Sequence, residues 1–246
     1  MKKSPPTFGA KLASYVCFSL AAAAVTAFQQ ATAADLATAS KRADFKDSRP
    51  SDEVKKLADW VLDSNNHRRL PFLLIDKKAA RVFAFHADGR LRGAAPVLLG
   101  MALGDDSAPG IGQRTLSAIL PDERTTPAGR FVAALDRNVH DKEILWVDYD
   151  TAISLHPVIT STPKERRAQR LASPTPLDNR ISYGCINVPV TFYEQVISPA
   201  FKGTNGIVYI LPETRSAREV FGSYDVEQHR QQQSADESIS GVSADI

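Results

Sequence analysis

Residues 72–99 read FLLIDKKAARVFAFHADGRLRGAAPVLL, and this stretch indicates a β protein. Two short β-prone runs, Phe72 to Ile75 and Val82 to Phe85, are separated by Asp76-Lys77-Lys78. Asp88-Gly89 then forms a second turn signal before the run from Leu91 to Leu99. Short apolar runs divided by turn-forming residues predict consecutive hairpins.

The pattern continues toward the C-terminus, where Gly, Pro and Asp again divide short runs. These runs are Leu116 to Leu120, Phe131 to Leu135, Ile144 to Asp148, Ala152 to Leu155 and, as a closing strand, Ile207 to Leu211. One helix is expected from Pro189, which suits a first turn, to Pro199, which can end it. A second helix is expected after Ser51, a good N-cap residue, and should pack on the main domain. We therefore expect a mainly β fold, an antiparallel or mixed β-sandwich with one or two packed helices.

The N-terminus has the features of an export signal. Lys2 and Lys3 precede an apolar stretch, Leu12 to Phe28, and the small residues Ala31-Thr32-Ala33 follow it. This order predicts a cleavable signal peptide over residues 1–33 and places the mature protein in the periplasm, with no stable membrane span after cleavage. A retained membrane anchor is the alternative, but the apolar core is short for a membrane span.

Composition divides the remainder into three segments. Residues 34–69 are expected to form a tether and the N-terminal helix, and residues 70–212 the main domain. Residues 213–246 are polar, contain Gln231-Gln232-Gln233, and are expected to form a flexible tail. The formal net charge is only +2 and no basic stripe is interleaved with aromatic residues, so no nucleic-acid partner is expected.

Cysteine usage points to one residue. Cys17 lies in the predicted signal, so Cys185 is the remaining thiol of the mature chain. A lone thiol in an oxidising compartment indicates chemistry, intermolecular pairing or burial as a small apolar residue. It lies in Ser182-Tyr183-Gly184-Cys185-Ile186-Asn187, between a Pro-rich loop and the Pro189 helix. A turn there can leave backbone N–H groups free, and Gly184 permits close approach of a substrate.

A nucleophilic thiol needs a group that accepts its proton. His156 is the best candidate because it ends the run from Ala152 to Leu155, at the edge of the predicted sheet. The other histidines are more simply solvated loop, strand-end or tail residues: His67, His86, His140 and His229. A zinc site is a weaker alternative, because one cysteine and scattered histidines show no ligand spacing.

Three sequence features together resemble the L,D-transpeptidase (YkuD-type) catalytic domain. They are the hexapeptide Ser182 to Asn187, the upstream His156, and Thr126-Pro127-Ala128-Gly129-Arg130-Phe131 before both. The resemblance covers roughly residues 70–212. Two positions depart from the family pattern: Tyr183 stands where the motif usually has histidine, and Pro157 where glycine commonly follows the upstream histidine.

The resemblance implies a periplasmic peptidoglycan L,D-transpeptidase whose partners are peptidoglycan stem peptides, with no metal or organic cofactor. It implies that Cys185 forms a thioester with the stem and that His156 accepts the thiol proton. The N–H groups of Gly184 and Cys185 would stabilise the oxyanion, and an amine would then resolve the thioester, by 3-3 cross-linking to a neighbouring stem or by attachment to stem peptides. Ser182 and Asn187 would shape the turn, and the Tyr183 hydroxyl could take over part of a histidine's orienting role.

Two other functions fit the same residues. An L,D-carboxypeptidase or other hydrolase would use water in place of the amine, and a non-catalytic envelope-binding protein would keep the fold without turnover. The loop from Ser161 to Asp178 carries Arg166, Arg167 and Arg170, which could attract stem carboxylates to the site. An ordinary solvated loop is the alternative for this segment.

Overall fold

The computed structural model describes residues 42–242, with side chains as far as Asp236. The predicted signal peptide, residues 1–33, and the first part of the predicted tether lie outside the described residues. Within the described part of the chain, no helix has the length and apolar character needed to cross a membrane.

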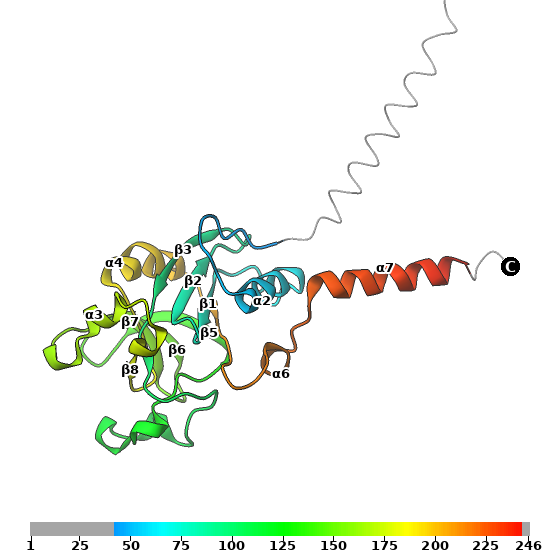
Figure 1. Cartoon of the computed structure of the whole chain (residues 1–246). Coiled ribbons are helices and arrows are strands. Elements are labelled where there is room, and N and C mark those ends of the chain that lie inside the picture. Colours follow the sequence, from blue (N-terminus) through cyan, green and yellow to red (C-terminus); the bar gives the residue numbers. More distant parts are fainter. Residues whose placement is uncertain (1–41, 243–246) are drawn as a thin grey trace, which may run out of the picture. The chain divides into compact units, whose positions relative to one another are not determined.

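The strands form one large mixed sheet, in the order β3-β2-β1-β10-β5-β6-β7-β9 (Figure 1). Most neighbours are antiparallel, whereas β1 pairs with β10, and β7 with β9, in parallel. The prediction of a mainly β, mixed-sheet fold is therefore confirmed. Its strands are β1 (Phe72–Asp76), β2 (Arg81–Phe85), β3 (Leu91–Pro96), β5 (Gly129–Arg137), β6 (Glu143–Asp148), β7 (Ile153–Pro157), β9 (Ile186–Val188) and β10 (Gly206–Ile210).

The two ends of this sheet approach each other, so the sheet is nearly closed. Leu98, just after β3, exchanges backbone hydrogen bonds of 2.8 and 2.9 Å with Asn187 on β9. The chain then continues into β4 (Leu99–Gly100), which pairs in parallel with β8 (Arg180–Ser182). This closure brings the segment around Cys185 to the junction between the small and the large sheet.

Side chains alternate between two cores, as the pleat of a strand requires. On β1, Leu73 and Ile75 join the core that is covered by α4 (Val190–Phe192), a π-helical turn (Tyr193–Ile197) and α5 (Ser198–Phe201). Phe72 and Leu74 join the opposite core, which α2 (Asp52–Asp63) covers. Both faces of the central strands are therefore buried, and the helices lie on opposite sides of the sheet (Figure 1).

The helix expected after Ser51 is α2. Ser51 has extended backbone and its Oγ accepts a hydrogen bond from the Val54 N–H, which caps the helix. The same hydroxyl donates to Asp76 Oδ2 at 2.7 Å, at the end of β1. One side chain thus fixes both the start of α2 and its position against the sheet, and the predicted packing on the main domain is confirmed.

Two predicted elements differ from the structure, and a third has an unexpected place in the sheet. Leu116 to Leu120 is not a strand, because Leu116 and Leu120 are exposed and only the intervening Ile119 is buried, so the segment has no apolar face to pair; it contains a 3₁₀ turn, Leu116–Ala118. Ile207 to Leu211 is the expected closing strand of the chain, β10, but it lies at the centre of the sheet and not at an edge. The Pro189 helix continues past Pro199 to Phe201, because proline is tolerated in the first turn of α5.

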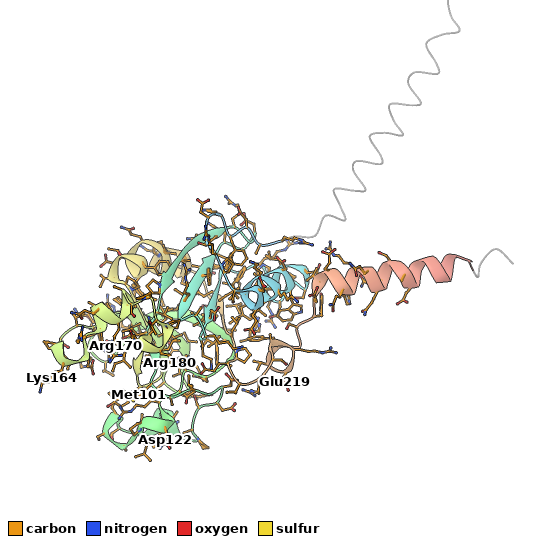
Figure 2. The ribbon with its side chains drawn as sticks, viewed as in Figure 1. Met101, Asp122, Lys164, Arg170, Arg180 and Glu219 are labelled. Carbon is orange, nitrogen blue, oxygen red and sulfur yellow. The ribbon has the colours of Figure 1, made fainter. Side chains whose placement is uncertain are left out.

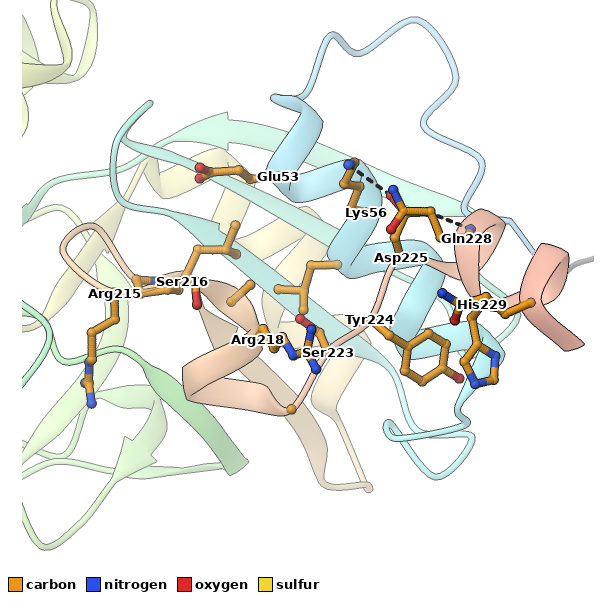
Figure 3. Close-up of a pocket in the computed structure, with 16 residues that line it drawn as sticks. Glu53, Lys56, Arg215, Ser216, Arg218, Ser223, Tyr224, Asp225, Gln228 and His229 are labelled. Atoms are coloured by element: carbon orange, nitrogen blue, oxygen red, sulfur yellow. Dashed lines mark hydrogen bonds and ion pairs between the residues drawn. The ribbon is translucent and has the colours of Figure 1, made fainter.

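Residues 213–242, expected to form a flexible tail, contain α6 (Ala217–Phe221) and α7 (Val226–Val242). The start of α7 packs on α2, where Val226 is buried and the Tyr224 ring lies edge-on to Trp60. Figure 3 shows the ion pair of Lys56 and Asp225, 2.9 Å apart, between the same segments. Polar composition concealed the few apolar anchors that order this part of the chain.

A charged cluster is buried where the C-terminal segment crosses the turn after β1. The Lys77 side chain is fully buried and donates to Gly104 O, Asp105 Oδ1 and Thr126 O at 2.6, 2.8 and 3.0 Å. Asp105 also accepts hydrogen bonds from the backbone of residues 213–215. Burial raises the pKa of Asp105, but these hydrogen bonds outweigh it and hold the pKa well below its usual value.

We expect Lys77→Met to lower the free energy of unfolding by about 3 kcal/mol or more, because it removes the buried cation that pairs with the Asp105 carboxylate and donates to two carbonyls. Lys78→Met is the matched control, since Lys78 makes an exposed ion pair with Glu53, and a change within about 0.5 kcal/mol is expected. Urea denaturation measures both. Equal effects of the two variants would show that the buried cluster contributes nothing special.

The same cluster gives a pH dependence with a definite sign. The folded pKa of Asp105 lies below its unfolded value of about 3.9, so its stabilisation is present above that pH and is lost as the pH falls further. Lys77→Met removes a main cause of that depressed pKa. The variant should therefore lose less stability than the wild type on acidification.

Candidate functional site

Parallel pairing of β7 with β9 assembles the site. In this register His156 lies opposite Asn187, and Leu155 lies opposite Ile186. Ser154 and His156 project from the same face of β7, because alternate residues of a strand do so. Cys185, one residue before β9, has its Sγ 3.5 Å from Ser154 Oγ and 3.6 Å from the carbonyl oxygen of Ala152. The thiol and the imidazole, 29 positions apart in sequence, are thus brought to one strand pair.

The turn before Cys185 is held by Ser182. Its Oγ donates to Cys185 O at 2.6 Å and accepts the Gly184 N–H at 3.1 Å. This is the turn-shaping position that the sequence analysis expected. The same bond contradicts the expectation that the Gly184 N–H is free for an oxyanion. No hydrogen bond is found for the N–H groups of Tyr183 and Cys185 within residues 42–242, so these two are the available donors.

Gly184 is required at its position for two reasons. Its φ of 127° lies in the region that favours glycine, and an added Cβ would lie 2.8 Å from the carbonyl oxygen of Thr125. Thr126, next to it, is completely buried, donates from Oγ1 to Gly184 O at 2.7 Å and accepts the Gly100 N–H at 2.8 Å. Thr126 therefore anchors the turn to β4, a role that its place in the Thr-Pro-Ala-Gly segment alone did not define.

Hydrogen bonds fix the tautomer of His156. Its Nδ1 lies 2.8 Å from the carbonyl oxygen of Pro157, which can only accept, so Nδ1 carries the proton. Its Nε2 lies 3.3 Å from the Asn187 amide nitrogen. Arg167 Nη1 donates to Asn187 Oδ1 at 2.5 Å, which orients the amide with its NH₂ group toward the imidazole. Nε2 is therefore the unprotonated nitrogen, as a proton acceptor requires.

The surroundings of Cys185 favour its thiolate. Burial raises the pKa of this half-buried thiol. The nearby imidazole of His156 and the hydrogen bonds from Ser154 lower it and outweigh burial, so the pKa lies below its ordinary value. Ser154 was not singled out in the sequence, although its position two residues before His156 on a strand was the available signal.

The arginines of the loop between β7 and β8 differ in role. Arg167 bonds Asn187 and also Glu165. Arg170 donates to the carbonyl oxygens of Glu165 and Asp178, which closes the loop on itself. Arg166 is exposed, and its side chain has no hydrogen bond or ion pair within the described residues. Figure 2 shows Lys164 at the outer end of this loop and Arg170 nearer the sheet. Arg167 and Arg170 are thus occupied in structural bonds.

Tyr183 also differs from expectation. Its hydroxyl has no hydrogen-bond partner in the described part of the chain, so no contact supports an orienting role. Its ring instead stacks with the guanidinium of Arg124, whose Cζ lies 3.9 Å from the ring centroid. A cation from elsewhere in the fold thus lies on the ring of Tyr183.

The remaining histidines are not bonded to these residues. His67 is buried, with its ring nitrogens 3.0 and 2.9 Å from the carbonyl oxygens of Val61 and Ala87, so the expectation of a solvated His67 is wrong. His229 stacks on Tyr224. A cavity of about 650 Å³ in that region lies between α2, α6 and α7 (Figure 3), and no residue of the Cys185 turn, nor His156, lines it.

Fold and site together define a mainly β protein with a candidate cysteine nucleophile, held beside a histidine on a parallel strand pair. No protein-family model matches the chain, and no curated protein matches it. Solved structures do match. A mutant of the helical cell shape determining protein Pgp2 from Campylobacter jejuni is 12% identical with a TM-score of 0.39, over 60% of this chain and 48% of that chain.

Two further matches are L,D-transpeptidases. The protein from Xylanimonas cellulosilytica is 15% identical with a TM-score of 0.36, over 57% of this chain and 60% of that chain. The catalytic domain from E. faecium is 14% identical with a TM-score of 0.34, over 57% of this chain and 96% of that chain. The chain spans about half the length of the Pgp2 chain.

Proposed function

We propose that this protein is a cysteine acyltransferase that acts on peptidoglycan stem peptides, an L,D-transpeptidase. One observation carries the proposal. The Cys185 thiol, whose pKa is lowered, contacts Ser154 on β7, and His156 on the same strand presents an unprotonated Nε2. The motif resemblance of residues 182–187 supports the substrate class. The N-terminal sequence supports a periplasmic location for the mature chain.

In the proposed reaction, His156 Nε2 accepts the thiol proton and Cys185 Sγ attacks the carbonyl that joins the third stem residue to the terminal D-residue. The tetrahedral oxyanion is held by the free N–H groups of Tyr183 and Cys185. His156 then returns its proton to the departing amine, and a thioester remains. A second amine attacks the thioester carbonyl and gives its proton to His156. The C–S bond breaks, the new amide forms the cross-link, and Cys185 Sγ leaves as the thiolate and takes the proton back from His156.

Asn187 and Arg167 keep the imidazole ready for this step. The Asn187 amide donates weakly to Nε2, and the 3.3 Å separation allows a thiol proton to replace it. Arg167 prevents the amide from turning its oxygen toward Nε2, because it holds that oxygen at 2.5 Å. Arg167 is thus proposed as a positioning residue and not as a substrate ligand.

The function is tested by incubating the purified mature protein with a disaccharide tetrapeptide and analysing the products by mass spectrometry. The expected result is a 3-3 linked dimer with release of the terminal D-residue. A tripeptide product without any dimer would show that the site has carboxypeptidase activity and not transpeptidase activity. An unchanged substrate, with no acyl-enzyme by intact mass, would contradict an enzymatic function.

We expect Arg167→Gln to slow acylation roughly tenfold, the effect of losing one hydrogen bond to a charged group, with little change in KM. The matched control is Arg166→Gln on the same loop, whose exposed side chain makes no bond within the described residues; it should acylate at the wild-type rate. Single-turnover acylation followed by intact mass measures both. If Arg166→Gln were the slower variant, the loop would act by attracting substrate and not through Asn187.

A further inference from the structure

Arg124 is held in a fixed position against the turn that carries the proposed nucleophile. Its guanidinium stacks on Tyr183, two residues before Cys185. Its backbone packs so closely against Gly100 that a Cβ there would lie 2.3 Å from the Arg124 carbonyl oxygen. The same carbonyl accepts the Ala102 N–H at 3.0 Å. Both the backbone and the aromatic ring therefore hold this side chain at the site.

The charge of Arg124 has no carboxylate partner among the described residues. Its Nε and Nη2 donate to the carbonyl oxygen of Ile119 at 3.3 and 3.1 Å, and no bond uses Nη1. The adjacent carboxylate, Glu123, binds Arg114 instead through two contacts of 2.9 Å. A half-buried cation is normally paired, because its desolvation is costly. An unpaired guanidinium with a free N–H beside a nucleophile is suited to binding an anion.

We propose that Arg124, supported by the ring of Tyr183, binds a carboxylate of the acyl donor next to the amide that Cys185 attacks. The inference rests on the proposed function and names the part of the substrate that this chain recognises. A stem peptide offers two such groups. One is the terminal carboxylate of the leaving residue, three bonds from the attacked carbon, and the other is a side-chain carboxylate on the third residue. Either would satisfy the free N–H and neutralise the guanidinium.

The first test does not depend on peptidoglycan. Iodoacetate and iodoacetamide both react by displacement, in which Sγ bonds to the CH₂ carbon and iodide leaves, but only iodoacetate carries a carboxylate. We compare the ratio of their alkylation rates at Cys185. Arg124→Gln should lower the iodoacetate-to-iodoacetamide ratio about fivefold, because the probe carboxylate loses its charged donor.

Two matched variants separate charge from folding. Arg124→Lys keeps the cation and should keep most of the ratio. Arg114→Gln removes a neighbouring arginine that Glu123 already neutralises, and its ratio should equal that of the wild type. All variants are first compared by thermal melting. A ratio that is unchanged in Arg124→Gln, or that falls equally in Arg114→Gln, would overturn the proposal.

The second test identifies the carboxylate. Acylation is measured with tetrapeptide stems that carry a free or amidated C-terminus, and a free or amidated third-residue side chain. Arg124→Gln should raise KM roughly tenfold for the free acid and have no effect on the donor whose partner carboxylate is amidated. The same loss with every donor would overturn the carboxylate assignment. If no stem acylates the wild type while the alkylation ratio still falls, the proposed function fails and the carboxylate site stands.

Discussion

Cys185→Ala is expected to abolish thioester formation with stem peptides, with a loss of roughly 10⁴-fold or more in acylation rate, because residues 42–242 offer no other thiol to replace Sγ. The free energy of unfolding should change by less than about 1 kcal/mol. The hydrogen bonds of the turn use the Cys185 carbonyl and not its thiol, so they remain in the variant. Intact mass spectrometry after incubation with a tetrapeptide measures the first effect, and thermal melting the second.

Ser154→Ala is the control, because it removes the hydroxyl 3.5 Å from Sγ and leaves the nucleophile. It should still form the acyl-enzyme, at a reduced rate. A Cys185→Ala protein that turns over at the wild-type rate would assign the nucleophile to another residue. If the variant were inactive only because it is unfolded, Cys185 would be a buried packing residue, which is the alternative that the sequence left open.

His156→Ala is expected to slow acylation by about 10²- to 10⁴-fold, the usual contribution of a positioned general base. It should also change the pH dependence of alkylation by iodoacetamide, which requires the thiolate. His156 is one of the groups that lower the pKa of Cys185, so its removal should raise the pH at which alkylation is half-maximal. The two effects have separate readouts, since alkylation does not need proton transfer to a substrate.

His140→Ala provides the comparison, because His140 is exposed in the turn between β5 and β6. Neither its acylation rate nor its alkylation midpoint should differ from the wild type. A greater loss of acylation in His140→Ala than in His156→Ala would assign the role of general base to His140. If the pH of half-maximal alkylation were unchanged in His156→Ala, the lowered pKa of Cys185 would be due to Ser154 and not to His156.

Much of the site was readable from local sequence because its residues lie in short segments with restricted conformations. The place of residues 182–187 between a Pro-rich loop and the Pro189 helix indicated a turn, and the structure has that turn. The assignment of the Gly184 N–H as an oxyanion donor was wrong, because the direction of one N–H depends on where the Ser182 hydroxyl lies. Arg124 could not be assigned to the site from local sequence, since it lies 59 positions before Tyr183.

The sequence alone determined the hairpins of residues 72–99, since short apolar runs there are divided by turn-forming residues. It also determined α2, because Ser51 caps it locally. The tertiary structure decided the order of the strands. β10 reads as a continuous apolar run because both its faces are buried, and only its parallel pairing with β1 places it at the centre of the sheet. The parallel pairing of β7 with β9 likewise decided which side chains meet Cys185, because no local pattern specifies a partner strand that lies thirty residues away.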